Sequence, residues 1–256
     1  MDINHISVSR ETCYKTCAYT YKLKYHSKVP APGEEPFYFS YGKICHLIAE
    51  EYVKAKGDKT LTEISGAVLK GDILLDGVKA PSLPPEYKNR LPGHLRSIEK
   101  LTTQIGFLDS ELELPFNLDL DPPHRKMIAG VIDRLILKDK CFIIDYKTTK
   151  RGKWRKTTDT IRTDLQLRAY AWAVNQIYHI DYDKIRGALY YLEGGNLIPT
   201  KFTENSVQAA VKELIAVYDE IKNCDPNTVI GTTGDHCARC DYRTICPFYQ
   251  LNKGRR

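Results

Sequence analysis

Two carboxylates and an amine lie in apolar stretches of this 256-residue chain. Asp133 follows Gly-Val-Ile, and Asp145 lies in Ile-Ile-Asp-Tyr-Lys, two residues before Lys147. A turn at 138–140 predicts an antiparallel hairpin that brings the carboxylates together, which suits Mg²⁺ or Mn²⁺. Because side chains two residues apart share a strand face, Lys147 would stabilise charge on a phosphate beside that cation. The pattern predicts phosphodiester hydrolysis; the alternative is that both acids end strands and Lys147 is solvated.

Two helices carry further candidate site residues. His46 lies in a helix predicted over 39–56, and imidazole is an acceptable third metal ligand. Gln166 and Tyr170 are four residues apart and therefore share one face of a helix predicted over 165–178. A glutamine amide there can hold a phosphate or the attacking water. Taken alone, a helical histidine is usually packed or solvated, and the Gln–Tyr pair is ordinary helix surface.

The C-terminal tail has a metal-ligating cysteine pattern. Cys237, Cys240 and Cys246 lie within ten residues, which leaves a tetrahedral site one ligand short. The fourth ligand must come from far away in the sequence, and Cys13 and Cys17 are the candidates. Iron–sulfur and zinc are both compatible with four thiolates. The other cysteines are expected to be small buried hydrophobic residues: Cys45, Cys141 and Cys224.

A basic loop follows the strand that carries Asp145. Its cations would hold phosphates, and its single tryptophan would stack on an unpaired base. A solvated run of charge is the alternative, since basic loops are common. The loop contains Lys150, Arg151, Lys153, Trp154, Arg155 and Lys156.

Composition limits the class of protein. A formal net charge of +6 with 42% hydrophobic residues is typical of a globular chain that tolerates a polyanionic partner. No apolar run reaches the length of a membrane span, and the first fifteen residues lack the apolar core of a secretory signal. We therefore expect a cytoplasmic protein without a membrane partner, in a reducing compartment where the eight cysteines are ligands or buried thiols.

The candidate residues need a scaffold of helices and strands. Helical spacing is found at 6–25, 39–56, 165–178 and 205–223, and a helical insert is expected at 58–109 with a loop at 81–93. β-Branched or alternating runs predict strands at 111–118, 127–137, 140–147, 185–192 and 198–202. The tail from residue 231 is expected to be loop. This order predicts a mixed α/β core.

In this order the motifs resemble those of the PD-(D/E)xK nuclease superfamily, in particular its RecB/AddB-type exonuclease branch. The family pattern is a helix with G…H, a strand with G-x-(I/V)-D, a strand with (I/V)-D-x-K-T and a helix with Q-x-x-x-Y. The matching residues are Gly42/His46, Gly130/Asp133, Asp145-Tyr146-Lys147-Thr148 and Gln166/Tyr170, over roughly residues 39–178.

The resemblance implies a restriction-endonuclease-like core, which is a mixed central sheet flanked by helices. It also implies roles for single residues. Lys147 would be catalytic, with Gln166 and Tyr170 as supporting site residues. The implied metal ligands are His46, Asp133, Asp145 and the backbone carbonyl of Tyr146.

The resemblance extends to the cysteines. Iron–sulfur exonucleases of this branch, including CRISPR-associated members, have one N-terminal and three C-terminal cysteines, with a first site similar to S-x-S-x-L-x-x-Y-x-x-C-P. Cys17 aligns with the cysteine of that site together with Ser7, Ser9 and Tyr14. Glu11 and Ala18 depart from the pattern, which leaves Cys13 as an alternative ligand.

The implied cofactor is a [4Fe–4S] cluster that joins the two ends of the chain, with structural zinc as the alternative. Its ligands would be Cys17, Cys237, Cys240 and Cys246. The expected organisation is an N-terminal segment at 1–38, a nuclease core at 39–230 and a C-terminal cluster segment at 231–256.

We therefore expect a metal-dependent deoxyribonuclease, and specifically an exonuclease on single-stranded DNA ends, in repair, recombination, phage replication or CRISPR adaptation. The alternative is a non-catalytic DNA-binding or assembly subunit that retains the fold. The chain has no G-x-x-x-x-G-K-[ST] motif, so any unwinding would come from a helicase partner. Recombination and CRISPR adaptation proteins are the other partners expected.

Overall fold

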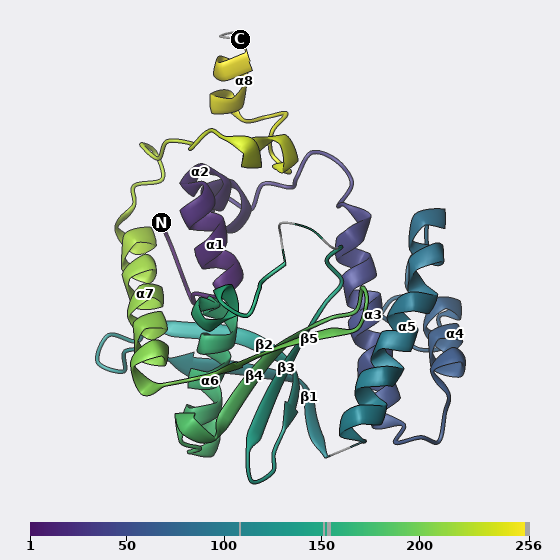
Figure 1. Cartoon of the computed structure of the whole chain (residues 1–256). Coiled ribbons are helices and arrows are strands. Elements are labelled where there is room, and N and C mark those ends of the chain that lie inside the picture. Colours follow the sequence, from purple (N-terminus) through teal and green to yellow (C-terminus); the bar gives the residue numbers. More distant parts are fainter. Residues whose placement is uncertain (108, 151, 153–154, 254–256) are drawn as a thin grey trace. The chain divides into compact units, whose positions relative to one another are not determined.

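The computed structural model describes residues 1–107, 109–150, 152 and 155–253, with side chains up to Gln250. The chain forms two compact units, whose elements are labelled in Figure 1. Unit 1 consists of Met1–Glu35, Phe116–Gly130 and Gln208–Arg256, and unit 2 consists of Pro36–Pro115 and Val131–Val207. The expected division at 1–38, 39–230 and 231–256 stays a prediction.

A mixed five-stranded sheet has the order β1-β2-β3-β4-β5. β2 and β3 form the predicted antiparallel hairpin, with Leu135 opposite Ile143. β3 and β4 are parallel because helix α6 returns the chain across the sheet, and β4 and β5 are antiparallel. The strands are β1 (Ser110–Asp119), β2 (Met127–Ile136), β3 (Cys141–Lys147), β4 (Ile185–Tyr191) and β5 (Asn196–Lys201).

Helices of unit 2 flank the sheet. Ile144 and Tyr146 of β3 are buried in one hydrophobic core with Ile48 of α3, Ile64 of α4 and Leu101 of α5. Alternate residues of β3 point the other way, and α6 contacts β3 and β4. This arrangement is the α/β architecture that the sequence predicts. The helices are α3 (Phe37–Lys54), α4 (Leu61–Lys70), α5 (Pro85–Ile105) and α6 (Leu165–Tyr178), with 3₁₀ turns η2 (Thr160–Thr163) and η3 (Tyr182–Lys184).

Unit 1 brings N-terminal and C-terminal segments together. The side chain of Ser7 caps the first helix by accepting a hydrogen bond from the Arg10 amide. Tyr242 donates a hydrogen bond of 2.9 Å to the Val29 carbonyl, from more than two hundred residues away. The helices are α1 (Val8–Thr16), α2 (Ala18–Tyr21), the π-helix η1 (Lys22–His26), α7 (Glu204–Asn223), the 3₁₀ turn η4 (Asp235–Arg239) and α8 (Pro247–Lys253).

Three expectations about these elements are wrong. The loop expected at 81–93 is largely helix, since α5 begins at Pro85, where proline is pre-organised for a first turn. Pro92 lies inside that helix, whose buried face compensates for the lost backbone hydrogen bond. The tail contains α8 rather than loop alone, and the Cys224 side chain is only partly buried.

Within the described part of the chain, no helix combines the length and apolar character needed to cross a bilayer.

Candidate metal centre

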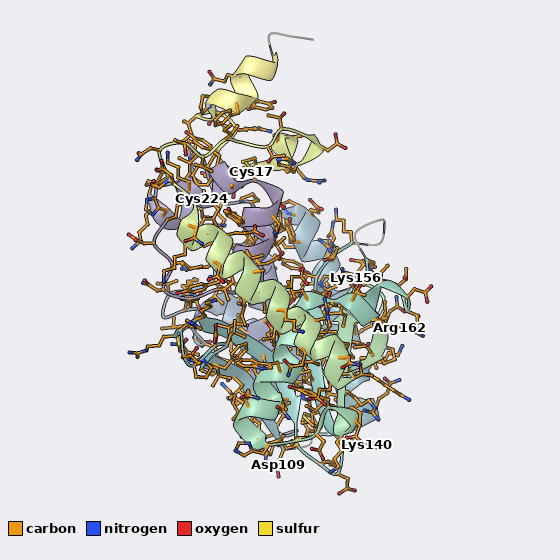
Figure 2. The ribbon with its side chains drawn as sticks, turned by 90° about the vertical axis from the view of Figure 1, so that its left-hand side faces the viewer. Cys17, Asp109, Lys140, Lys156, Arg162 and Cys224 are labelled. Atoms are coloured by element: carbon orange, nitrogen blue, oxygen red, sulfur yellow. The ribbon has the colours of Figure 1, made fainter. Side chains whose placement is uncertain are left out.

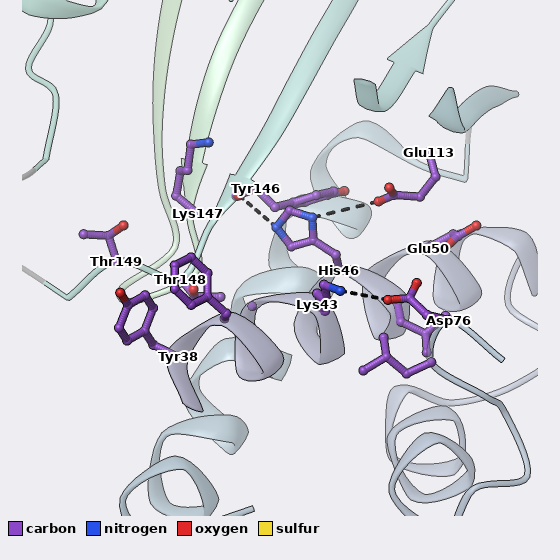
Figure 3. Close-up of a pocket in the computed structure, with 14 residues that line it drawn as sticks. Tyr38, Lys43, His46, Glu50, Asp76, Glu113, Tyr146, Lys147, Thr148 and Thr149 are labelled. Carbon is purple, nitrogen blue, oxygen red and sulfur yellow. Dashed lines mark hydrogen bonds and ion pairs between the residues drawn. The ribbon is translucent and has the colours of Figure 1, made fainter. Parts of the chain in front are cut away.

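His46 lies where helix α3 passes the end of strand β3. Its Nε2 donates a hydrogen bond of 3.0 Å to the Tyr146 carbonyl oxygen. Its Nδ1 lies 3.5 Å from Asp133 Oδ2. The same atom lies 3.9 Å from Glu113 Oε1, a contact that Figure 3 shows. One imidazole therefore faces two carboxylates and a carbonyl oxygen from three different strands, and three of these four groups were expected from the sequence.

The cation-binding potential of this cluster comes from three side chains. One ligand atom each of His46, Glu113 and Asp133 lie within 4.8 Å of one another. Sequence reasoning missed Glu113, which belongs to a run that reads as an ordinary half-buried strand. Glu113 has a backbone φ of +45°, an unusual value for a residue other than glycine, and such values are concentrated at functional sites.

Asp145 lies beside this cluster and pairs with Lys147. Its Oδ2 is 2.6 Å from Lys147 Nζ, so the two side chains share a strand face as predicted. The β2–β3 register, extended by one pair, places Asp133 opposite Asp145. Asp133 Oδ2 also accepts a hydrogen bond of 2.7 Å from the Tyr146 amide. The ion pair with Lys147 sets Asp145 apart from the three-residue group that meets around His46.

Gln166 and Tyr170 join the site through Lys147. Lys147 Nζ donates a hydrogen bond of 3.0 Å to Gln166 Oε1, and Gln166 Nε2 donates one of 2.7 Å to the Tyr170 hydroxyl. Asp164 accepts a hydrogen bond from the Leu167 amide and thereby caps α6, which fixes Gln166 in its first turn. The chain of contacts holds the ammonium of Lys147 in one position.

Burial and mutual repulsion make the acidic groups of the cluster hard to ionise. Burial first, and then the charge of Asp145, raise the pKa of Asp133 well above its usual range. Burial and the charge of Asp133 raise the pKa of Glu113 to about 7. Burial lowers the pKa of His46, which favours neutral imidazole. These oxygen and nitrogen donors, crowded and short of positive charge, fit a hard divalent cation such as Mg²⁺ or Mn²⁺.

The ammonium of Lys147 stays charged in this environment. Burial by itself lowers its pKa, but the charge of Asp145 and the contact between the two side chains outweigh burial, so that the pKa is raised. Lys147 is therefore a fixed positive charge at the edge of the site rather than a proton acceptor.

A groove with a volume of about 770 Å³ opens onto the cluster. His46, Glu113 and Lys147 line it, and Figure 3 shows Thr148 and Thr149 on its wall. Two of the three candidate ligands and Lys147 therefore line one groove.

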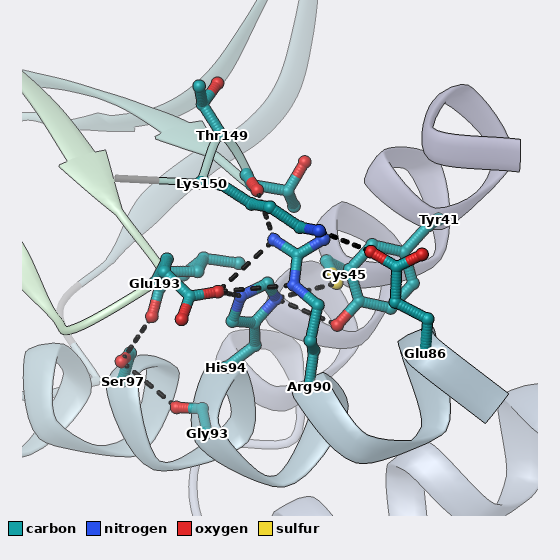
Figure 4. Close-up of polar contacts among 12 residues, drawn as sticks. Tyr41, Cys45, Glu86, Arg90, Gly93, His94, Ser97, Thr149, Lys150 and Glu193 are labelled. Atoms are coloured by element: carbon teal, nitrogen blue, oxygen red, sulfur yellow. Dashed lines mark hydrogen bonds and ion pairs between the residues drawn. The ribbon is translucent and has the colours of Figure 1, made fainter. Parts of the chain in front are cut away.

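A buried polar network supports the backbone that follows Lys147 (Figure 4). Arg90 of α5 donates hydrogen bonds of 2.9 Å to the Thr148 carbonyl and 3.2 Å to Glu193 Oε2. His94 Nε2 lies 3.2 Å from the same carboxylate oxygen, and its Nδ1 lies 2.9 Å from the Tyr41 hydroxyl. The helical insert thus fixes the groove wall, a role that no local sequence pattern indicated.

The described cationic residues of the predicted basic loop contact other groups of the protein. Arg155 donates hydrogen bonds to the backbone carbonyls of Thr149 and Glu193, at 3.1 and 2.6 Å. Lys150 forms an ion pair with Glu86, and Lys156 Nζ lies 3.8 Å from an Asp164 oxygen. The remaining cationic and aromatic members, Arg151, Lys153 and Trp154, lie outside the described residues.

The cysteines of unit 1 do not meet in a shared ligand group among the residues described. Cys17, labelled in Figure 2, is buried, whereas Cys237, Cys240 and Cys246 are partly buried. Burial raises the pKa of the Cys13 thiol to about 11, and neighbouring Cys17 and Cys240 add to the shift. Thiols from both ends of the chain therefore lie within electrostatic range of each other.

The chain is similar to known proteins in sequence and in fold. The chain matches the family model of the PD-(D/E)XK nuclease superfamily over residues 5–247, and no curated protein matches it significantly. Its structure is similar to that of a protein from Eubacterium rectale named "Putative exonuclease", with a TM-score of 0.53 and 14% identity, covering 93% of this chain and 87% of that one. SSO0001 is also similar, with a TM-score of 0.37 and 16% identity over 90% of this chain and 95% of its own. Since the family match spans nearly the whole chain, the protein belongs to the PD-(D/E)XK nuclease superfamily.

Proposed function

We propose that the protein is a metal-dependent deoxyribonuclease that removes nucleotides from single-stranded DNA ends. One observation carries this proposal: two members of the His46–Glu113–Asp133 cluster, His46 and Glu113, line the same groove as the charged Lys147. Hydrolysis of a phosphodiester needs positive charge on the phosphate and an oriented water, and the groove offers sites for both.

The proposed cation ligands are His46, Asp133, Asp145 and the Tyr146 carbonyl, with Glu113 added from the geometry. A divalent cation supplies charge to the scissile phosphate and acidifies the attacking water when it is bound. Asp145 holds the Lys147 ammonium at 2.6 Å, and Lys147 in turn orients the attacking water or a phosphate oxygen. Gln166 and Tyr170 hold Lys147 in place.

We also propose that the protein is of the RecB/AddB iron–sulfur type. The nearness of Cys13 to both Cys17 and Cys240 supports this proposal, because it brings thiols from the two ends of the chain into one region of unit 1. The proposed [4Fe–4S] ligands remain Cys17, Cys237, Cys240 and Cys246, with zinc as the alternative. The cluster would be structural, since hydrolysis needs no redox chemistry.

The basic loop at 150–156 is proposed to contact the DNA backbone. Arg155 contributes by shaping the loop, because its guanidinium is bonded to backbone carbonyls. The proposed setting is cytoplasmic repair, recombination, phage replication or CRISPR adaptation, with a helicase, recombination or adaptation protein as partner.

Cleavage of end-labelled single-stranded DNA with Mn²⁺, and with EDTA instead, tests the proposal. We expect cleavage that EDTA abolishes, and a loss of at least about a hundredfold in Asp145→Ala and Lys147→Ala. The controls are Asp181→Ala and Lys184→Ala, which break a surface ion pair of unit 2. Retained cleavage in folded Asp145→Ala or Lys147→Ala would reject the assignment, and a wild type that binds DNA without cutting it would indicate the non-catalytic subunit.

A further inference from the structure

Two large aromatic side chains stand exposed at the start of helix α3. Tyr38 is 51% exposed and Phe39 is 41% exposed. Their ring centroids are 4.4 Å apart, with an angle of 38° between the rings. Both residues line the groove that leads to His46. Exposed aromatic pairs in a groove mark binding sites more often than isolated exposed apolar residues do.

The neighbouring aromatics of α3 pack against helix α5. The Phe37 ring lies 4.9 Å from that of Tyr87, and the Tyr41 ring lies 4.6 Å from it. Tyr41 is also buried and bonded to His94. The inner face of the helix start is therefore fixed to α5, so that Tyr38 and Phe39 project from a rigid element.

The helix aligns this pair with the metal centre. Tyr38, Gly42 and His46 are four residues apart in turn and so lie along one stripe of α3. Gly42 also lines the groove, and a Cβ atom there would make an ordinary contact of 3.7 Å with Thr148 Oγ1, so the helix and the Thr148 segment lie close together between the two ends. At the helical rise, Tyr38 stands ~12 Å along the axis from His46.

We propose that Tyr38 and Phe39 form a stacking platform for an unpaired nucleobase of the strand whose phosphate lies at the metal centre. The proposal rests on the nuclease function proposed above. Nucleobases stack on aromatic side chains in a sequence-tolerant way because every base has a π-face. In a duplex those faces are covered by neighbouring bases, so that the platform selects single strands.

The charges around the pair favour a nucleotide over an apolar protein segment. The same groove contains the ammonium groups of Lys43 and Lys147, the hydroxyls of Thr148 and Thr149, and the carboxylates of Glu50, Asp76 and Glu113. A base on the aromatic rings and a phosphate beside the Lys147 ammonium would occupy both ends of the groove at once, with or without a bound cation. An apolar peptide would leave the charged end unsatisfied.

Equilibrium binding in EDTA tests the platform without requiring cleavage. Fluorescence anisotropy is measured with a labelled oligothymidylate and with a strand of equal length made of abasic units. We expect Tyr38→Ala and Phe39→Ala each to weaken binding of the oligothymidylate roughly tenfold and to leave the abasic strand unaffected. Tyr38→Phe keeps the π-face and should bind as the wild type does.

Phe142→Ala is the matched control, because Phe142 is also 41% exposed but does not line the groove. The platform would be overturned if Tyr38→Ala and Phe39→Ala lost affinity equally for the oligothymidylate and the abasic strand, or bound both as the wild type does. An equal loss of affinity in Phe142→Ala would also overturn it. A blunt hairpin duplex is measured as a third probe. If the variants lost affinity for this duplex alone, the rings would stack on a terminal base pair, and the assignment to unpaired bases would be wrong. A protein that fails to cut DNA but shows base-dependent binding would refute the proposed hydrolysis and retain the platform.

Discussion

At the scale of single residues, the site concentrates acidic groups that cannot all be ionised without a cation. Glu113 is the clearest case, because burial and Asp133 raise its pKa to about 7 while its unperturbed value is 4.5. A carboxyl that is harder to ionise when folded binds a proton more tightly in the folded state. A cation must displace that proton, so cation binding and protonation compete.

The pH dependence of cation binding follows from this competition. We expect the apparent Mn²⁺ affinity to rise as pH increases from 5.5 to about 7, and Glu113→Gln to weaken binding and flatten the rise. Titration calorimetry at several pH values measures both effects. Glu111→Gln, an exposed change in the same strand, is the control. An unchanged profile in Glu113→Gln would remove Glu113 from the site.

Without metal, the contribution of Glu113 to the free energy of unfolding should change with pH in the opposite direction to the Mn²⁺ affinity. Because the folded pKa of Glu113 lies above its unfolded value, the folded state binds more protons between pH 4.5 and about 7. Its contribution to the free energy of unfolding therefore falls as pH rises through that window. Asp133 acts in the same direction and His46 in the opposite one, so the comparison of wild type with Glu113→Gln isolates this residue. Chemical unfolding in EDTA at pH 5 and pH 8 measures the difference, and an identical pH slope in both proteins would contradict it.

At the scale of elements, helix α5 positions the segment that follows Lys147. Arg90 binds the Thr148 carbonyl and Glu193 together, and its side chain is only 15% exposed. Burial and contacts with Glu193 act in opposite directions on His94, and the net effect lowers the pKa of that imidazole. A neutral His94 can donate to Glu193 and accept from Tyr41, which leaves the network complete.

Arg90→Met should therefore slow catalysis by letting the backbone that follows Lys147 move out of position. The change leaves the partly buried Thr148 carbonyl without its Arg90 donor and leaves Glu193 with His94 as a side-chain donor, which lowers the free energy of unfolding by about 1–3 kcal/mol. We expect kcat to fall roughly tenfold or more, while Mn²⁺ affinity changes little. Steady-state kinetics and calorimetry separate the two quantities, with Arg96→Met on the exposed side of α5 as control. A wild-type kcat in Arg90→Met would contradict the positioning role.

Most helices and strands could be predicted because the spacing of their apolar residues matched the face that each element buries. The β-branched runs around Asp133 and Asp145 gave a hairpin, and the apolar stripe of α6 gave a helix. Pro92 misled the prediction, since its local effect breaks helices while the burial of Leu91 and Ile98 holds this one together. Glu113 and Arg90 could not be identified because their partners are distant in sequence and their own surroundings look ordinary.

At the scale of the whole molecule, N-terminal and C-terminal segments share unit 1, where Tyr242 bonds to the Val29 carbonyl. A metal cluster bound by cysteines of both segments would close a long loop of the chain, which is the kind of closure expected to stabilise most. The cysteine pattern could be found in the sequence because its spacing is local in the tail. The choice between Cys13 and Cys17 depends on three-dimensional placement, which spacing does not specify.

The cysteine proposal predicts a coloured protein. Anaerobically purified wild type should absorb broadly in the visible range and contain iron and sulfide, and Cys17→Ser and Cys237→Ser should lose both and melt at lower temperature. Cys224→Ser, which changes a partly buried thiol of the same unit, should keep them. A colourless wild type with one zinc per chain would establish zinc instead. If Cys13→Ser lost the colour and Cys17→Ser kept it, Cys13 would be the N-terminal ligand in place of Cys17.

The proposed nuclease function requires above all one cation shared by His46, Glu113 and Asp133. Electron spin echo spectroscopy of Mn²⁺ added to the protein measures this directly, because a bound imidazole nitrogen couples to the electron spin. We predict one Mn²⁺ with a nitrogen coupling in the wild type, a coupling that disappears in His46→Ala, and greatly weakened binding in Asp133→Asn. Mn²⁺ bound equally well by all three proteins without nitrogen coupling would contradict the site.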